Sequence, residues 1–121
     1  MQDTIVYQDA KFQIVATDEK GAGGAYHEYS IWTKTGDFDY YDQKLCQISF
    51  QNGGMQEAGI NGIHNEHLIA ILMHRLRCFQ DGPFPSEYNA DAFEGLRTAR
   101  LSLEARTRDR INRGVEGQSV A

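Results

Sequence analysis

The chain has 121 residues and a formal net charge of −5 at pH 7, and 40% of its residues are hydrophobic. This size fits one domain, or a small sheet and a helical unit that share a core, and the apolar content argues against wholesale disorder. The acidic balance excludes a general DNA- or RNA-binding protein, which is normally basic, and no apolar run approaches the ~18 residues of a membrane span.

The N-terminal residues and the cysteines indicate a reduced, intracellular environment. Residues 1–10 contain two acids and no basic cluster, so they lack a signal-peptide pattern, and we expect a cytosolic protein. Cys46 and Cys78 are the two cysteines, and neither sits at a metal-ligand spacing. We therefore expect two reduced and largely buried thiols.

The first 61 residues predict a meander of about five short antiparallel strands. Four of these strands are expected where β-forming or alternating residues gather, at residues 5–7, 11–16, 26–32 and 45–51. Loops are expected at 18–24, which combines glycine with charge, and at 36–42. Asn52-Gly53-Gly54 is a hairpin signal because these residues tolerate positive φ, so the fifth strand is expected at 55–60.

After Asn61-Gly62 the hydrophobic period becomes helical. Asn65 is expected to cap a first helix whose apolar stripe is Leu68, Leu72, Leu76 and Phe79, and Asp81-Gly82-Pro83 ends that helix. A second helix is expected at about 87–112, with the stripe Ala92, Leu96, Ala99 and Leu103. The short link makes the two helices antiparallel neighbours. The sequence therefore predicts an α+β fold, with a small antiparallel β-sheet in residues 1–61 and a C-terminal antiparallel helical hairpin in residues 62–121, as one compact unit.

Arginine is confined to the second half of the chain. All eight arginines lie in residues 62–121, and six of them lie in 96–113 beside only two acids. The stripe of the second helix continues at spacings of 3 or 4 into Arg106, Arg110 and Arg113. A guanidinium fork suits phosphate, so arginines one turn apart could bind a pyrophosphate or a cyclic phosphodiester. The simpler interpretation is that the helix projects solvated cations, which suit a helix C-terminus.

Aromatic residues gather around the link between the helices. Phe79, Phe84 and Tyr88 lie close in sequence to Asn89. An aromatic face and an amide can stack a base and read its edge. Alternatively, Phe79 completes the apolar stripe and Phe84 covers the hairpin end, which is the interpretation we favour for Phe84.

The histidines and carboxylates give little support for catalysis. His64, His67 and His74 have no HExxH, CxxC or further carboxylate at ligand spacing, so no metal and no cofactor is expected. No Cys-His or Ser-His nucleophile motif is present, and Asp37 and Asp39 are expected to be solvated loop residues. We therefore expect a protein that is not an enzyme.

Three stretches resemble one known family. They are residues 48–53 with 59–62 (ISFQNG and GING), residues 65–80, and residues 106–117, which end in Arg-Gly-Val-Glu-Gly. Together they resemble the phage Thoeris anti-defence proteins of the first type. The helical hairpin alone also resembles the anti-CBASS sponges of the second type. The resemblance covers residues 45–121, and the preceding strands match only in general character.

This resemblance implies a sponge for nucleotide immune signals in the cytoplasm of an infected bacterial host. It implies a homohexamer built from dimers that holds glycocyclic ADP-ribose signals intact, with cyclic di- or trinucleotides at separate sites in some members. It implies no nucleic-acid polymer and no membrane as partner. The residues that match the family's binding motif are Phe79 for base stacking, Asn89 for polar contacts, and Arg106 and Arg110 for phosphates.

The chain departs from the family pattern at two places. An arginine that many such hairpins have two positions before the asparagine is Glu87 here, and an acid there repels phosphate, which weakens the expectation of a cyclic trinucleotide site. The usual Thr-His after Val-Glu-Gly is Gln118-Ser119. Two other functions stay open: a nucleotide-degrading enzyme that uses the histidines, and a non-catalytic module that docks subunits through its acidic and Arg-rich halves.

Overall fold

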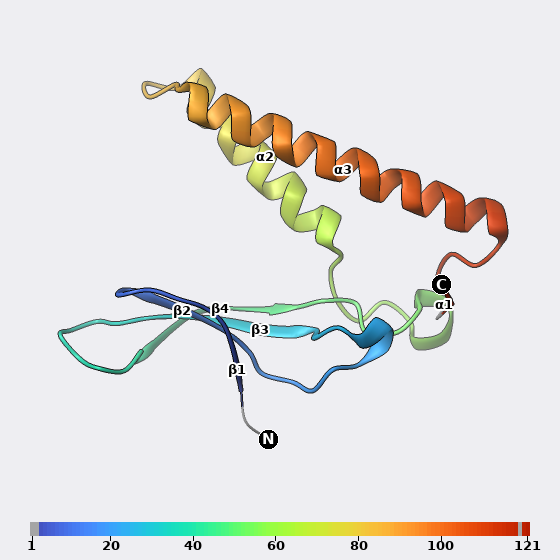
Figure 1. Cartoon of the computed structure of the whole chain (residues 1–121), viewed down its shortest axis with the longest axis horizontal. Helices are drawn as coiled ribbons and strands as arrows, with labels where there is room; N and C mark the ends of the chain where they lie inside the picture. Colours follow the sequence, from blue (N-terminus) through green and yellow to red (C-terminus); the bar gives the residue numbers. More distant parts are fainter. Residues whose placement is uncertain (1–2, 119) are drawn as a thin grey trace. The chain divides into compact units, whose positions relative to one another are not determined.

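The structure, a computed structural model, describes residues 3–118 and 120–121 and forms two compact units (Figure 1). The first unit contains the described residues up to Ile63 together with Gly117, Gln118 and Ala121. The second unit contains His64–Glu116 with Val120. Four strands and a short helix come first, and two long helices follow, so the predicted α+β class is confirmed.

The first unit is built on a four-stranded sheet. Its strands are β1 (Thr4–Gln8), β2 (Phe12–Ala16), β3 (Glu28–Thr33) and β4 (Gln43–Ser49). They lie in chain order and each neighbouring pair is antiparallel, as expected for strands joined by short turns. Val15 and Ala16 are buried on β2, and Ser30 is buried on β3 opposite Val15. The predicted positions of the first four strands are confirmed to within a few residues.

The turn between β1 and β2 is organised by one carboxylate. Asp9 Oδ1 accepts hydrogen bonds from the backbone N–H groups of Lys11 (2.8 Å) and Phe12 (2.7 Å), while its Oδ2 accepts from the Tyr7 hydroxyl (2.7 Å). The Tyr7 hydrogen bond, followed by the two backbone bonds, lowers the pKa of Asp9. An aspartate that bonds the backbone two and three residues ahead is a common way to fix a turn.

The fifth strand predicted at 55–60 is wrong. Residues Met55–Ala58 form the short helix α1, with Gly54 as its N-cap and Gly59 as its C-cap. Gly59 has a φ of 72°, which only glycine adopts easily, and this ends the helix after a single turn. Met, Gln, Glu and Ala are all good helix formers, so the local preference of these four residues outweighed the hairpin signal before them.

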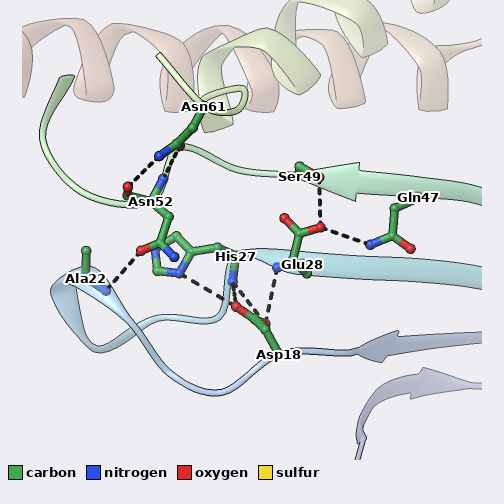
Figure 2. Close-up of polar contacts among 8 residues, drawn as sticks. All are labelled: Asp18, Ala22, His27, Glu28, Gln47, Ser49, Asn52 and Asn61. Carbon is green, nitrogen blue, oxygen red and sulfur yellow. Dashed lines mark hydrogen bonds and ion pairs between the residues drawn. The ribbon is translucent and has the colours of Figure 1, made fainter. Parts of the chain in front are cut away.

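A polar network fixes the glycine-rich loop that follows β2 (Figure 2). The Asp18 carboxylate accepts the backbone N–H groups of His27 (3.1 Å) and Glu28 (3.2 Å). His27 is only 6% exposed, and its Nδ1 lies 4.0 Å from the same carboxylate. The loop in between contains the 3-10 turn η1 (Ala22–Gly24). The segment predicted to be a turn or a mobile loop contains a turn and is tied to the start of β3 by several hydrogen bonds.

Asparagine side chains hold the segment after β4. Asn52 Oδ1 accepts the Ala22 backbone N–H (3.3 Å), which links this segment to the glycine-rich loop. Asn61 and Asn52 exchange two hydrogen bonds of 2.8 Å, with the Asn61 side chain bonding the Asn52 backbone (Figure 2). Phe50 and Ile63 also form a parallel bridge. Side-chain amides thus replace the strand pairing that was expected here.

The second unit is a hairpin of two helices. These are α2 (Asn65–Asp81), with 17 residues, and α3 (Glu87–Arg113), with 27 residues. His64 is the N-cap of α2, so the predicted capping role of Asn65 is wrong by one position: His67 Nδ1 accepts the His64 backbone N–H at 2.9 Å. Ser86 caps α3 by accepting the Asn89 N–H at 3.0 Å. Gly114, with a φ of 74°, ends α3.

The buried stripes of the two helices are rotated from the predicted ones. Along α2 the least exposed positions are Glu66, Leu68, Ile69, Met73, Leu76 and Gln80. Along α3 they are Asn89, Phe93, Leu96, Arg100, Leu103, Thr107 and Arg110. Leu68, Leu76, Leu96 and Leu103 were predicted correctly, whereas Leu72 and Phe79 are 46% and 48% exposed. Polar residues among the less exposed positions hid the register from a pattern based on aliphatic residues alone.

The environment of the two cysteines differs from the predicted one. Cys46 and Cys78 are unpaired, as expected, but both are exposed, so the prediction of buried thiols is wrong. Cys46 lies on the last strand of the sheet, and Cys78 lies on the outer side of α2, where neither is covered within one chain.

In the described part of the chain, every helix is too short or too polar to traverse a bilayer.

Replacement by alanine should have opposite effects on the free energy of unfolding at Gly62 and at Gly95. A Cβ at Gly62 would lie 2.4 Å from the carbonyl carbon of Phe50, whereas a Cβ at Gly95, inside α3, meets nothing within 4 Å. Gly62→Ala should lower the free energy of unfolding by about 1–3 kcal/mol because backbone must move. Gly95→Ala should raise it by about 0.5–1 kcal/mol through helix propensity. Urea unfolding followed by circular dichroism measures both, and a neutral Gly62→Ala would contradict the close packing of this segment.

Candidate functional site

The tip of the hairpin carries an aromatic ring and an amide. Phe79 lies near the C-terminus of α2 and Asn89 in the first turn of α3, so both belong to the same end of the hairpin (Figure 1). Phe79 is 48% exposed. The Asn89 backbone N–H bonds Ser86, but the half-buried Asn89 side chain has no hydrogen-bond partner among the described residues. The tip can therefore offer a ring face and an unused amide.

The link between the helices adds exposed aromatic surface. Phe84 is 78% exposed and Tyr88 is 86% exposed, so Phe84 does not plug the hairpin end within one chain. Gln80 instead closes the link, because its Oε1 accepts the Ser86 backbone N–H at 2.8 Å. The preferred interpretation, in which Phe84 covers the end of the hairpin, is therefore wrong, and the side-chain amide of Gln80 holds the link instead.

The far end of α3 holds the arginines, and they differ in their environments. Arg106 is exposed and has no ion pair or hydrogen bond within the described ranges. Arg110 is 5% exposed. Its Nη groups donate to the backbone carbonyls of Val115 (2.9 Å) and Val120, and its Nε lies 3.5 Å from the Glu116 carboxylate. Arg110 thus ties the C-terminal tail to the end of α3.

The predicted continuation of the core-facing stripe into the three arginines holds for Arg110 alone. Only Arg110 continues the buried stripe, three residues after Thr107, whereas Arg106 lies beside that stripe and Arg113 is exposed, with its Nε 3.0 Å from Asp109 Oδ2. An interval of 3 or 4 residues keeps side chains only roughly aligned along a helix, so small offsets accumulate over several turns. The carbonyl-rich tail, which the sequence pattern did not reveal, is what makes burial of Arg110 tolerable.

Helix geometry separates the four predicted binding residues into two pairs. Asn89 and Arg106 are 17 positions apart on one continuous helix, which corresponds to about 25 Å at 1.5 Å per residue. Arg110 lies about 6 Å further along the same axis. Phe79 with Asn89, and Arg106 with Arg110, therefore cannot surround one small ligand within a single chain.

The histidines have local partners. His67 bonds the backbone at the start of α2, and its ring packs edge-on against His64, with centroids 5.6 Å apart. His74 Nε2 lies 3.8 Å from Cys78 Sγ, one turn along α2. Among the described residues, no group of three or more His, Cys, Asp or Glu side chains is placed to hold a metal ion. The structure therefore gives His64 and His67 a role in starting a helix.

Comparison with known proteins identifies the hairpin. The Acb2/Tad1 hairpin domain matches residues 42–108, which is more than half of the chain. The chain belongs to this family. The matched range contains Phe79, Asn89 and Arg106, and it ends just before Arg110. The resemblance stated from the sequence is thereby confirmed.

One curated relative extends this result. A protein of Bacillus phage SBSphiJ7 named Thoeris anti-defense 1 is 45% identical over 74 residues, which are 61% of this chain and 52% of the relative. The chain therefore spans about half the length of the curated relative it matches. Membership of the Acb2/Tad1 hairpin family rests on the hairpin and the last strand of the sheet, whereas β1 to β3 lie outside the matched range.

The two arginines should differ in their effect on folding. Arg110→Ala removes a buried charge from two carbonyls and a carboxylate, and we expect it to lower the free energy of unfolding by about 2 kcal/mol. Arg106→Ala removes an exposed side chain and should stay within about 0.5 kcal/mol of the parent. Chemical denaturation of both variants measures this difference. Equal stabilities would mean that the Arg110 contacts contribute nothing to the native state.

Proposed function

We propose that this chain is a phage anti-defence protein that binds a cyclic ADP-ribose-type signal nucleotide and holds it intact. The observation that carries the proposal is the set of unused recognition groups on the hairpin: a half-exposed ring at Phe79, an unpartnered amide at Asn89 and an unpaired guanidinium at Arg106. These are the chemical groups that stack a base, read its edge and neutralise a phosphate. The name of the phage relative supports the anti-defence role.

Binding without turnover is the function that these groups support best. Tight capture requires contacts to the ground state of the ligand, whereas catalysis requires groups that favour a transition state. The ring, the amide and the guanidinium all serve the first purpose. The exposed His74 and Cys78 pair, with 3.8 Å between Nε2 and Sγ, is the arrangement that would favour the alternative of a degrading enzyme.

The binding site requires a second copy of the chain. Because Asn89 and Arg106 lie about 25 Å apart along α3, one ligand can contact both residue pairs only if the arginine end of one chain meets the hairpin tip of another. A two-fold dimer with antiparallel α3 helices makes this contact twice and forms two identical sites. The hairpin also exposes apolar side chains that a neighbour can cover, namely Ile71, Leu72, Leu101 and Ile111. Three such dimers would give the hexamer that the resemblance implies.

The two arginines would contribute differently to such a site. Arg106 has no competing partner among the described residues, so it can give its guanidinium fork to a phosphate directly. Arg110 already donates to the Val115 and Val120 carbonyls, so a phosphate contact from Arg110 requires the tail to share or release these donors. Arg106 is therefore the principal phosphate ligand of the proposed pair.

A catch-and-release assay tests the sponge proposal. The purified protein is incubated with glycocyclic ADP-ribose, and separately with cyclic di- and trinucleotides, then freed of unbound ligand and heat-denatured. We expect release of intact glycocyclic ADP-ribose, and Arg106→Ala should weaken its binding by more than ~2 kcal/mol. Arg108→Ala is the matched control, since Arg108 is equally exposed and unpaired in the described chain but faces another direction. Recovery of a cleaved product, abolished by His74→Ala, would establish the enzyme instead.

Mixing two inactive variants tests the shared site. Phe79→Ala and Arg106→Ala should each abolish tight binding, but a dimer that contains one chain of each variant has one intact site and one doubly altered site. After denaturation and refolding of an equimolar mixture, binding should return to about a quarter of the parental stoichiometry, for random pairing into two-fold dimers. Calorimetry measures the stoichiometry. A mixture that remains inactive would contradict a site shared between chains.

A further inference from the structure

Arg75 lies against the ring that is proposed to stack the base. Its Cζ is 5.6 Å from the centroid of the Phe79 ring, one turn earlier on α2. This is the distance at which a guanidinium interacts favourably with an aromatic face. The ring is 48% exposed, so Arg75 leaves part of its surface accessible.

The charge of Arg75 is not neutralised within the described chain. Four other arginines of the hairpin have a carboxylate within 4.0 Å, namely Arg97, Arg100, Arg110 and Arg113. Arg75 has no such partner in the described ranges, and the Phe79 ring is its recorded contact. Arg77, Arg106 and Arg108 share this lack of a carboxylate, but none of them lies over an aromatic ring. An unpaired cation beside a half-exposed ring is therefore found once on this hairpin, within the residues described.

We propose that Arg75 contacts a phosphate of the same nucleotide whose base stacks on Phe79. A nucleotide places its phosphate one ribose away from its base, and one helical turn of about 5.4 Å separates Arg75 from Phe79 along α2. A guanidinium that lies over a ring keeps its N–H groups free at its edge, where they can donate to phosphate oxygens. This inference rests on the proposed function and adds a phosphate ligand from the chain that supplies the ring.

The competing role is a structural one. A long side chain on a helix surface covers apolar neighbours with its methylene stem, and Arg75 could do this for Phe79 without touching a ligand. The two roles differ in what they predict. A phosphate contact makes binding more sensitive to salt, because salt screens the attraction between the guanidinium and the phosphate, whereas a covering role leaves this dependence unchanged.

Calorimetry with glycocyclic ADP-ribose over a range of salt concentrations separates the two roles. Arg75→Ala should weaken binding about tenfold or more and reduce the slope of log Kd against log salt. Arg75→Lys, which keeps the charge without the planar fork, should recover part of the affinity and the parental slope. Arg77→Ala is the control on the same helix and should stay within about twofold of the parent, as expected for an exposed side chain without a partner.

Each failure has a distinct signature. If the parent protein binds the nucleotide and Arg75→Ala matches Arg77→Ala in affinity and salt slope, the phosphate contact is overturned while the proposed function stands. Weakened binding with an unchanged slope also overturns it, in favour of the covering role. If the parent protein binds no nucleotide, the proposed function fails and this inference fails with it. Unfolding curves of all three variants establish that each remains folded.

Discussion

The fixed rise of an α-helix governs what the hairpin can do. With 27 residues, α3 is about 40 Å long, whereas α2 has 17 residues and covers only part of it. Two consequences follow from this one mismatch. The end of α3 extends beyond its partner and carries the arginines, and the aromatic tip lies too far away to meet them in the same chain. In the proposed shared site, assembly and ligand binding would therefore be coupled, because the neighbour that covers the exposed apolar side chains would also supply the arginines.

The sequence predicted the positions of the strands and helices better than it predicted which residues of each helix are buried. The strands and the two helices follow from β-branched residues, helical periodicity and the breakers at Gly82 and Pro83, all of which act locally. The errors concern tertiary context. Asn89, Arg100 and Thr107 lie on the less exposed side of α3, and aliphatic periodicity alone cannot show this. The prediction of a strand at 55–60 was wrong because the Asn52-Gly53-Gly54 pattern indicates only that the chain turns, and it does not show that a partner strand follows.

The residues of the candidate site stay a prediction from the sequence, whereas the structure gives them an arrangement that the sequence did not predict. The helical spacing suggested Arg106 and Arg110 together as phosphate ligands. In the structure Arg106 is exposed, whereas Arg110 donates to main-chain carbonyls of the segment that follows the helix. Nothing in a pattern of charges distinguishes these two states, because the difference depends on the positions of Val115, Glu116 and Val120. Arg75 was missed although its i, i+4 relation to Phe79 was present in the sequence. That spacing becomes informative only once the ring is known to remain exposed.

The arginine-rich end of α3 sits on a chain whose total charge is −5, and this contrast bears on rates. At physiological ionic strength a charge is felt over roughly 8 Å, so an anionic nucleotide senses the guanidinium groups only when it is already close. Long-range steering toward the protein is therefore weak or unfavourable, and encounter proceeds at the pace of unassisted diffusion. If the chain binds a nucleotide as proposed, its affinity would then come from slow dissociation, with the ring, the amide and the guanidinium groups lengthening the residence time of the bound molecule. The protein would be effective by abundance and by how long it holds its ligand, rather than by how quickly it finds it.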